Sequence, residues 1–130
     1  MTRREYNDYT SAIIECAIEV HKELGPGLLE SVYEVCLETL LIEKGILVER
    51  QKSLPIIFRN KPVGKEFYID LLIEREIIVE LKSINEILPI HEAQLITYMK
   101  LADVKLGLLI NFNVTILKNG IKRKIIGEIL

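Results

Sequence analysis

The sequence predicts an α+β protein in which helices pack against a mixed β-sheet. Apolar residues recur at three- and four-residue steps in two N-terminal segments and again in residues 90–102, a pattern typical of amphipathic helices. Short runs rich in Ile, Leu, Val and Phe lie after the first two segments and are separated by turn-forming residues, as β-strands are. Because several strands follow one another before the next helix, the order favours an α+β sandwich.

The first two helices are expected over residues 10–24 and 28–44. The Gly25-Pro26-Gly27 corner ends the first helix, and Gly45, which accepts the left-handed conformation common after helices, ends the second. The residues expected to face inward are Ile13, Cys16, Ala17, Val20 and Leu24 in the first helix, and Leu29, Val32, Cys36 and Leu40 in the second.

The remainder of the chain reads mainly as strands. Pro89 precedes a third helix, residues 90–102, whose inner face is formed by Leu95, Met99 and Ala102. The Asn119-Gly120 dipeptide tolerates the positive φ angles of a two-residue turn and predicts a C-terminal hairpin. The predicted order is ααββββαβ plus that hairpin, with strands at residues 46–50, 54–60, 63–74, 76–82 and 104–112.

Length and composition indicate a single domain over residues 1–130. A chain of 130 residues with 49% hydrophobic and 28% charged content is long enough for one core and too short for two. The first ten residues, MTRREYNDYT, contain no apolar signal region, and no apolar run approaches the length needed to cross a bilayer. We therefore expect a soluble, cytoplasmic protein that does not insert into membranes. Cys16 and Cys36 lie in helical patterns and are expected to be reduced core residues.

The overall charge argues against a protein that coats nucleic acid through bulk positive charge. The formal net charge is -2. The segment KNGIKRK, residues 118–124, supplies four cations around the predicted turn and reads either as a solvated hairpin or as part of a local basic groove.

Three charged residues, Asp70, Glu80 and Lys82, interrupt the most apolar strands. If the hairpin turns through three residues centred on Arg75, position 70 lies opposite position 80, and directly opposed residues have Cβ atoms about 4.5 to 5.5 Å apart. A two-residue turn would shift the register by one and place the two carboxylates on opposite faces. The sequence leaves both registers open.

Opposed carboxylates in a central sheet would repel one another and lose hydration, and a cation would relieve both costs. Oxygen-only ligands suit Mg²⁺ or Mn²⁺ better than zinc. The alternative is a partly exposed sheet face on which Lys82 forms an ordinary ion pair.

Two helices offer further polar residues. His91, Gln94 and Tyr98 form one stripe on the third helix, which either faces the carboxylates or is simply exposed, and His91 is also placed to begin the helix. Glu30 and Tyr33 share a face in the first turn of the second helix, where a glutamate also suits the helix dipole.

Taken together, these segments resemble a known family. GLLESVY, residues 27–33, matches the Gly-x-x-Glu-x-x-Tyr signature of the small GxxExxY proteins. The similarity continues through Asp70, ELK (80–82), HEAQLITY (91–98) and LGLLINF (106–112) and covers nearly the whole chain. Those proteins look like members of the PD-(D/E)XK nuclease superfamily, in the branch similar to RecB nucleases. The resemblance implies a restriction-endonuclease-like core.

The resemblance also implies roles for individual residues. Asp70 and Glu80 would bind a divalent ion, Mg²⁺ or Mn²⁺, with the Leu81 carbonyl as a further ligand and Glu30 reaching in from its helix. Lys82 would act on the attacking water, and the pair Gln94 and Tyr98 would orient the substrate phosphate or the lysine. Two departures from the superfamily pattern are Ile69 in place of the common proline and the absence of the four-cysteine cluster of some RecB-like nucleases.

The main functional hypothesis is a metal-dependent nuclease that hydrolyses phosphodiester bonds in nucleic acid, with DNA favoured over RNA as partner. The sequence leaves two alternatives open: a nucleic-acid- or protein-binding module that retains the site without turnover, and a small structural subunit. A homodimer or a larger complex also remains open, because fold and site do not establish the biological substrate or assembly.

Overall fold

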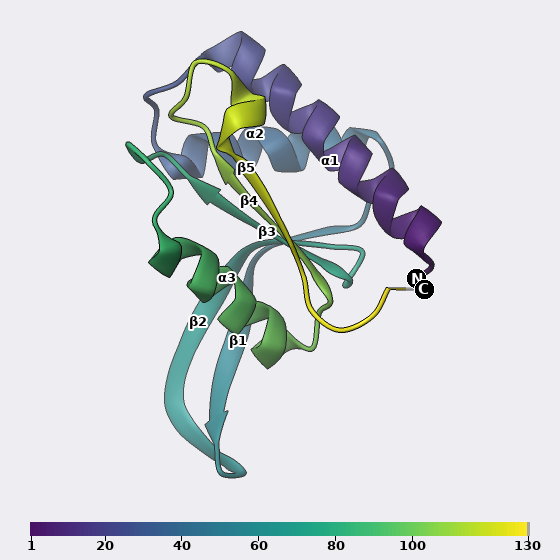
Figure 1. Ribbon diagram of the computed structural model, residues 1–130, viewed down its shortest axis with the longest axis vertical. Helices are drawn as coiled ribbons and strands as arrows, with labels where there is room; N and C mark the ends of the chain where they lie inside the picture. Colours follow the sequence, from purple (N-terminus) through teal and green to yellow (C-terminus); the bar gives the residue numbers. More distant parts are fainter. Residues whose placement is uncertain (130) are drawn as a thin grey trace.

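The computed structural model describes residues 1–129, and this part of the chain forms three α-helices, five β-strands and one short 3-10 helix. The α+β class expected from the sequence is confirmed, in the form of a restriction-endonuclease-like fold (Figure 1). The elements in chain order are α1 (Arg3–Leu24), α2 (Glu30–Glu43), β1 (Val48–Phe58), β2 (Lys61–Ile73), β3 (Ile77–Lys82), α3 (Pro89–Ala102), β4 (Leu106–Asn111), η1 (Leu117–Gly120) and β5 (Ile121–Ile125).

The five strands lie in the sheet in the same order as in the chain, β1-β2-β3-β4-β5. Neighbouring strands are antiparallel except for β3 and β4, which pair in parallel from Ile77↔Leu106 to Lys82↔Asn111. Parallel neighbours need a crossover connection, and α3 provides it. Because the order is β1-β2-β3-β4-β5, the apolar strands β3 and β4 both lie inside the sheet, and all six residues of β4 are buried.

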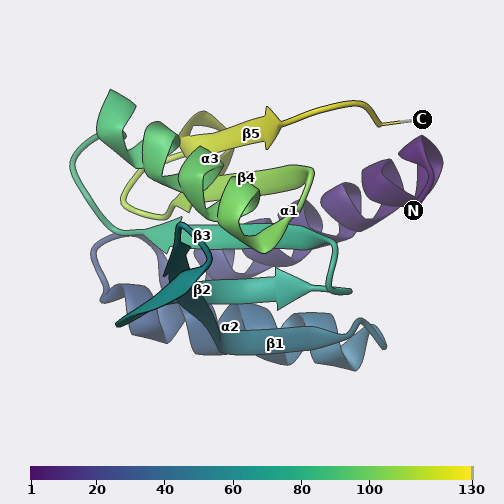
Figure 2. The ribbon, with the colours of Figure 1, turned by 90° about the horizontal axis from the view of Figure 1, so that it is seen from below.

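Helices cover both faces of the sheet (Figure 2). The helices α1 and α2 pack on one face, where Val79 and Leu81 of β3 join their core. The helix α3 packs on the other face through Leu95 and Met99, against Ile78 of the same strand. Successive side chains of a strand point to opposite faces, so β3 contributes apolar residues to both cores.

The helix α1 begins seven residues before the predicted start. Thr2 accepts a hydrogen bond from the Glu5 amide and the Glu5 side chain accepts one from the Thr2 amide, a reciprocal capping box that satisfies two otherwise free donors. Tyr6, in the added turn, is buried. The predicted end at the Gly-Pro-Gly corner is confirmed, because the helix stops at Leu24 and Gly25 adopts a φ of 72°.

The buried face of α2 differs from the expected one. Tyr33, Glu34, Leu37 and Leu41 are buried, whereas Leu29 is 74% exposed. Apolar residues surround this helix almost completely, so periodicity alone does not choose a face. The contact with the sheet chooses it: the Tyr33 ring stacks on Phe112 with centroids 4.3 Å apart.

Residues 46–50 and 54–60, expected as two strands, belong largely to the single strand β1. Pairing with β2 continues on both sides of Gln51, from Arg50↔Leu71 to Lys52↔Ile69. The polar residues at 50–53 break the apolar pattern because this part of β1 is mostly exposed, not because the strand ends. Three strands rather than four therefore precede α3.

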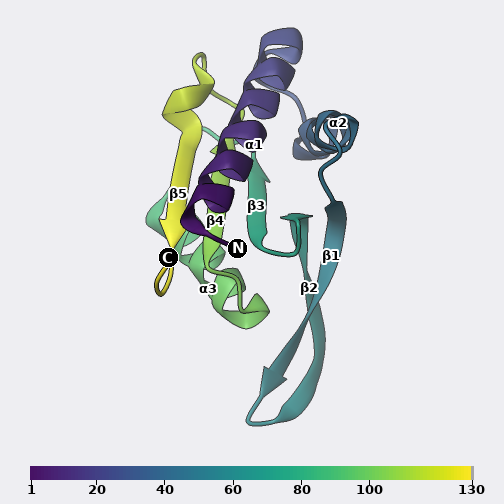
Figure 3. The same ribbon diagram turned by 90° about the vertical axis from the view of Figure 1, so that its right-hand side faces the viewer.

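The strands β1 and β2 extend well beyond their neighbours and form a projecting hairpin (Figures 1 and 3). The last pair is Phe58↔Lys61, and the two turn residues, Arg59 and Asn60, have φ angles of 50° and 64°. Such positive values at both positions match the twist of a two-residue hairpin turn. We call residues 52–67 the β-arm.

The predicted hairpin turn at Asn119-Gly120 is wrong. These two residues end the 3-10 helix η1, and the strand that follows, β5, pairs with β4 from Ile110↔Ile121 to Leu106↔Ile125. Gly120 is packed so closely that an added Cβ would lie only 2.3 Å from the Asn111 carbonyl oxygen. The glycine is needed for this close approach rather than for a positive φ angle.

Candidate active site

The turn between β2 and β3 sets the register that the sequence left open. Residues 74–76 form the turn, and the pairs Ile73↔Ile77, Leu72↔Ile78 and Leu71↔Val79 are symmetric about Arg75. Glu74 and Arg75 both have positive φ, 51° and 57°. The three-residue turn therefore forms, and Asp70 and Glu80 come next to each other just beyond the last pair.

Beyond this last pair, side chains replace the regular ladder. The Asp70 amide donates to Glu80 Oε1 over 3.4 Å, and the Leu81 amide donates to Asp70 Oδ2 over 2.9 Å. Each carboxylate thus accepts a main-chain hydrogen bond from the neighbouring strand. These bonds hold both carboxylates in place at the point where β2 leaves β3.

Glu80 is only 8% exposed, although it carries a carboxyl group. Burial, followed by the nearby charge of Asp70 and a hydrogen bond with it, raises the pKa of Glu80 from 4.5 to about 9. All three causes disfavour the ionised form. At neutral pH and without a cation, Glu80 is therefore protonated next to Asp70, and a cation that binds the pair must displace this proton.

Lys82 follows on the same strand and is half-buried. Its charge lowers the pKa of Glu80, but only as the smallest of the five influences on that carboxyl. Among residues 1–129 no carboxylate lies within ion-pair distance of the Lys82 ammonium. The ordinary Lys82 ion pair considered from the sequence is therefore absent from this part of the chain.

The polar stripe of α3 contributes Tyr98 to the site. Tyr98 is half-buried, and its pKa is raised by burial and by the charges of Glu80 and Asp70. Gln94 is exposed and donates from Nε2 to Tyr98 Oη over 3.4 Å. His91 instead accepts a hydrogen bond from the Leu88 amide through Nδ1 over 2.9 Å and begins the helix.

Glu30 lies close to the end of β3 but does not contact the carboxylate pair. Its Oε1 accepts a hydrogen bond from the amide of Ser83 over 3.3 Å, and the Ser83 hydroxyl donates to the Leu28 carbonyl over 2.6 Å. These bonds fasten the start of α2 to the residue after Lys82. In this structure Glu30 is a neighbour of the site rather than a member of the pair.

Tyr33, the last residue of the Gly-x-x-Glu-x-x-Tyr segment, is fully buried. Its hydroxyl donates to the Gly25 carbonyl over 2.6 Å and accepts from the Leu28 amide over 3.1 Å. It thereby closes the Gly25–Leu28 corner against the core. This tyrosine positions the corner that leads into Glu30, the first residue of α2.

Two residues at the site were missed by sequence reasoning, Gln51 and Glu34. Gln51 Nε2 donates to Glu34 Oε1 over 2.8 Å and to Asp70 Oδ1 over 3.2 Å. Gln51 has a φ of 51°, unusual for a residue other than glycine within a strand, and this conformation accompanies the placement of its amide between the two carboxylates. No feature of the sequence marks this conformation.

Glu34 is 5% exposed and lies on the buried face of α2. Its pKa is raised, mainly by burial and partly by the charge of Asp70, while the hydrogen bond from Gln51 acts in the opposite direction. Arg50 Nε lies 3.7 Å from Glu34 Oε1. Glu34 lies in line with Leu37 and Leu41, three and seven residues later, but the apolar residues on the other sides of α2 hide this stripe from the sequence.

The donor set at this site fits a cation that keeps part of its water shell. Within the described residues, no three His, Cys, Asp or Glu side chains are grouped closely enough to hold a metal ion. Asp70 and Glu80 supply two carboxylates, and Mg²⁺ is commonly bound by one or two carboxylates together with waters and substrate phosphates. The chemistry of the pair therefore suits Mg²⁺ or Mn²⁺.

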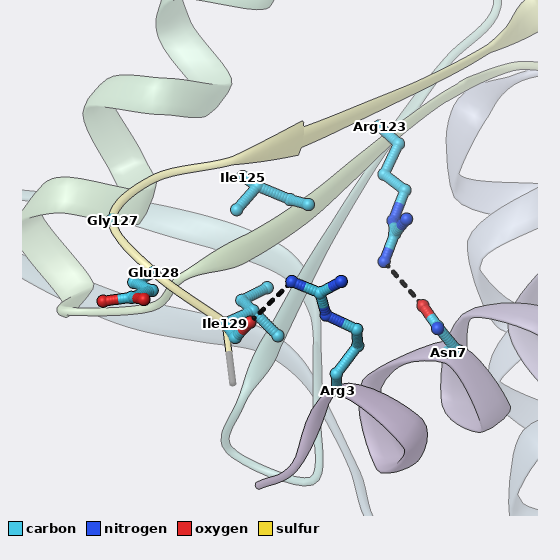
Figure 4. Close-up of a pocket in the computed structure, with 7 residues that line it drawn as sticks. All are labelled: Arg3, Asn7, Arg123, Ile125, Gly127, Glu128 and Ile129. Atoms are coloured by element: carbon cyan, nitrogen blue, oxygen red, sulfur yellow. Dashed lines mark hydrogen bonds between the residues drawn. The ribbon is translucent and has the colours of Figure 1, made fainter.

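A separate pocket of about 410 Å³ lies between the start of α1 and the chain after β5 (Figure 4). Its arginines are already engaged: Arg3 donates to the Ile129 carbonyl and Arg123 donates to the Asn7 side chain. None of the predicted site residues lines this pocket.

No helix within residues 1–129 is long and apolar enough to span a membrane.

Comparisons with known proteins agree with this geometry. Searches of curated proteins and of solved structures find no match. A family model described as the PD-(D/E)XK nuclease superfamily matches residues 7–124, a span that contains Asp70, Glu80 and Lys82 as well as all three helices except the first four residues of α1. With nine-tenths of its length matched, and with the aspartate and the Glu-x-Lys segment meeting on neighbouring strands, the chain belongs to the PD-(D/E)XK nuclease superfamily.

Proposed function

We propose that this protein is a metal-dependent nuclease that hydrolyses phosphodiester bonds. The observation that carries the proposal is the contact between Asp70 and the buried Glu80, whose pKa is about 9. Folding gains nothing from burying one carboxyl against another, and strongly perturbed titratable groups with a specific charge partner are typical of functional sites. Members of this superfamily are generally dependent on divalent metal ions.

Asp70 and Glu80 would hold Mg²⁺ or Mn²⁺, together with the Leu81 carbonyl, and Glu30 of α2 would join them if it left the Ser83 amide. When bound, such an ion polarises a phosphoryl oxygen and lowers the pKa of a bound water. The chain's own groups act around it. The Lys82 side chain, whose ammonium has no carboxylate partner in the described part of the chain, would act on the attacking water. The Gln94 amide and the Tyr98 hydroxyl orient the substrate phosphate.

A second candidate is a nucleic-acid- or protein-binding module that keeps the site without turnover. The position of Glu30 favours it, because this carboxylate is bonded to the Ser83 amide instead of facing Asp70. A site with only two carboxylates in contact binds a cation less tightly than one with three.

A cleavage assay separates the two candidates. Purified protein is incubated with single- and double-stranded DNA and RNA in Mg²⁺, in Mn²⁺ and in EDTA. We expect cleavage that requires the metal and is abolished by Asp70→Asn. Metal binding without cleavage of any of these substrates would favour the binding module, and cleavage that persists in Asp70→Asn would remove the site as assigned.

The role of Lys82 has its own test. Lys82→Met preserves the length and the apolar stem of the side chain and removes the charge. We expect the variant to fold and to bind Mn²⁺ while cleavage falls by about 10²-fold or more, because a side chain positioned to act on the attacking water contributes about that much. Unchanged cleavage would show that Lys82 takes no part in the reaction.

A further inference from the structure

The β-arm, residues 52–67, differs from the rest of the molecule in charge. It contains four cations and one carboxylate, a net charge of +3, whereas the whole chain has -2. The remaining residues therefore carry -5. Among residues 1–129, three of the four arm cations, Arg59, Lys61 and Lys65, take part in no ion pair, and the fourth, Lys52, lies 3.1 Å from Glu49. The arm is a positively charged projection on an acidic protein.

Exposed aromatic side chains lie on the β-arm and at its base. Phe58 is 63% exposed, Phe67 48% and Tyr68 52%. The Arg59 guanidinium lies over the Phe58 ring, 5.3 Å from its centroid. Exposed aromatic rings next to unpaired cations are the combination with which proteins bind single-stranded nucleic acid, since bases stack on the rings and phosphates meet the cations.

The arm also leads directly to the candidate active site. Phe67 is three residues before Asp70 on β2, and its ring lies against Tyr98 of α3 with centroids 6.0 Å apart. From Lys61 at the tip to Asp70 the strand spans nine steps, about 30 Å at the usual rise of a β-strand. A stacked nucleic-acid strand with a rise of about 3.4 Å would cover this distance with about nine nucleotides.

We propose that the β-arm binds single-stranded nucleic acid and guides it toward Asp70 and Glu80. The inference rests on the nuclease function proposed above and adds the form of the substrate. A second copy of this chain is a weaker candidate for the arm surface, because two arms of the same charge repel one another. Duplex is also disfavoured, since its bases are already stacked and cannot use the exposed rings.

Binding of fluorescein-labelled oligo(dT) and oligo(rU), each of about 20 nucleotides, tests the proposal in EDTA, where no cleavage is needed. The variant R59S/K61S/K65S removes three arm cations. Because each phosphate contact on a single strand contributes about 0.7 to the slope of log affinity against log salt, we expect this slope to fall by about 2. The matched control K22S/K44S/K118S removes the same charge from exposed positions outside the arm and should leave the slope unchanged.

A second variant, Phe58→Ala, tests stacking independently of charge. Removing one stacked base costs about tenfold or more in affinity, so we expect weaker binding with an unchanged salt slope and a loss of the preference for single strand over duplex. Binding of either oligonucleotide supports the proposal, and comparison of oligo(dU) with oligo(rU), which differ only in the 2′-hydroxyl, identifies the sugar that the arm prefers.

The proposal is overturned if the wild type binds neither oligonucleotide, if the control triple variant weakens binding as much as the arm variant, or if both arm variants bind normally. It is also overturned if sedimentation shows a dimer that Phe58→Ala abolishes while oligonucleotide binding persists. Since binding is measured without metal, failure of cleavage in the wild type would remove the nuclease function and leave the binding result standing, and the reverse also holds.

Discussion

Replacing Glu80 with glutamine should stabilise the metal-free protein at neutral pH, although the two side chains have nearly the same size. The glutamine can still accept from the Asp70 amide through Oε1, and its amide group can donate to the Asp70 carboxylate. What the substitution removes is the ionisable group. The effect on stability therefore reports how strongly the folded protein perturbs this carboxyl.

The magnitude follows from the pKa of Glu80, which is about 9 in the folded protein and 4.5 in the absence of perturbation. Between these values the folded protein holds a proton that the unfolded chain has lost, so stability falls as the pH rises, by about 1.4 kcal/mol per pH unit. At pH 7 the accumulated loss is about 3 kcal/mol relative to a residue that does not ionise. For a domain of this size that corresponds to roughly 10 °C in melting temperature.

Thermal melts of the wild type and Glu80→Gln in EDTA at pH 5, 6 and 7 measure this effect. We expect the variant to be more stable than the wild type by at most about 1 kcal/mol at pH 5 and by about 3 kcal/mol at pH 7. Exposed Glu86 provides the matched control, because Glu86→Gln should produce no difference that grows with pH. Comparing each variant with the wild type at the same pH cancels the titration of all other groups.

Added Mn²⁺ should oppose the gain, because the ion stabilises only the protein that binds it. Wild type gains about 4 kcal/mol when free Mn²⁺ exceeds its dissociation constant by a thousandfold, enough to reverse the ranking. The reasoning is refuted if Glu80→Gln melts below the wild type at pH 7 in EDTA. That result would mean that Glu80 is ionised and paired in the folded protein, where its loss destabilises by about 1 to 3 kcal/mol.

Three further outcomes are expected. Mn²⁺ affinity should rise by up to tenfold per pH unit between pH 6 and 8, because Glu80 must lose its proton, and Asp70→Ala should abolish binding. Calorimetry in buffers of different ionisation enthalpy measures both effects, and pH-independent binding would contradict the titration of Glu80. Gln51→Gly should be more stable than Gln51→Ala by about 1 kcal/mol in chemical denaturation, because both lose the amide but only glycine adopts the φ of 51° freely, and equal stability would argue against backbone strain. Tyr33→Phe should cost about 1 to 2 kcal/mol of stability, since it leaves the Gly25 carbonyl without its donor, while Mn²⁺ affinity stays unchanged; lost affinity would place Tyr33 in the site.

The elements that the sequence predicted well are those whose local pattern allows one solution. The helix α1 has a single apolar stripe and a Gly-Pro-Gly stop, and α3 has the same kind of inner face, so both were placed correctly except for the first turns of α1. The helix α2 is apolar on nearly all sides, and its buried face is decided by the stacking of Tyr33 on Phe112, a residue almost eighty positions away. Glu34 was missed at the site for this reason.

By itself, the sequence determined the class of fold, the central strands and the residues that could form the carboxylate pair, because hydrophobic periodicity and residue chemistry are local properties. The tertiary structure alone decided the register that joins Asp70 to Glu80, the left-handed Gln51 that ties Asp70 to Glu34, and the bond between Glu30 and Ser83. The projection of the β-arm beyond the sheet was likewise hidden, since strands were predicted at residues 54–60 and 63–74 but their composition does not show that the neighbouring strand stops short of them. Each of these features depends on backbone conformation or on a contact between distant segments, and neither leaves a mark on the local pattern of residues.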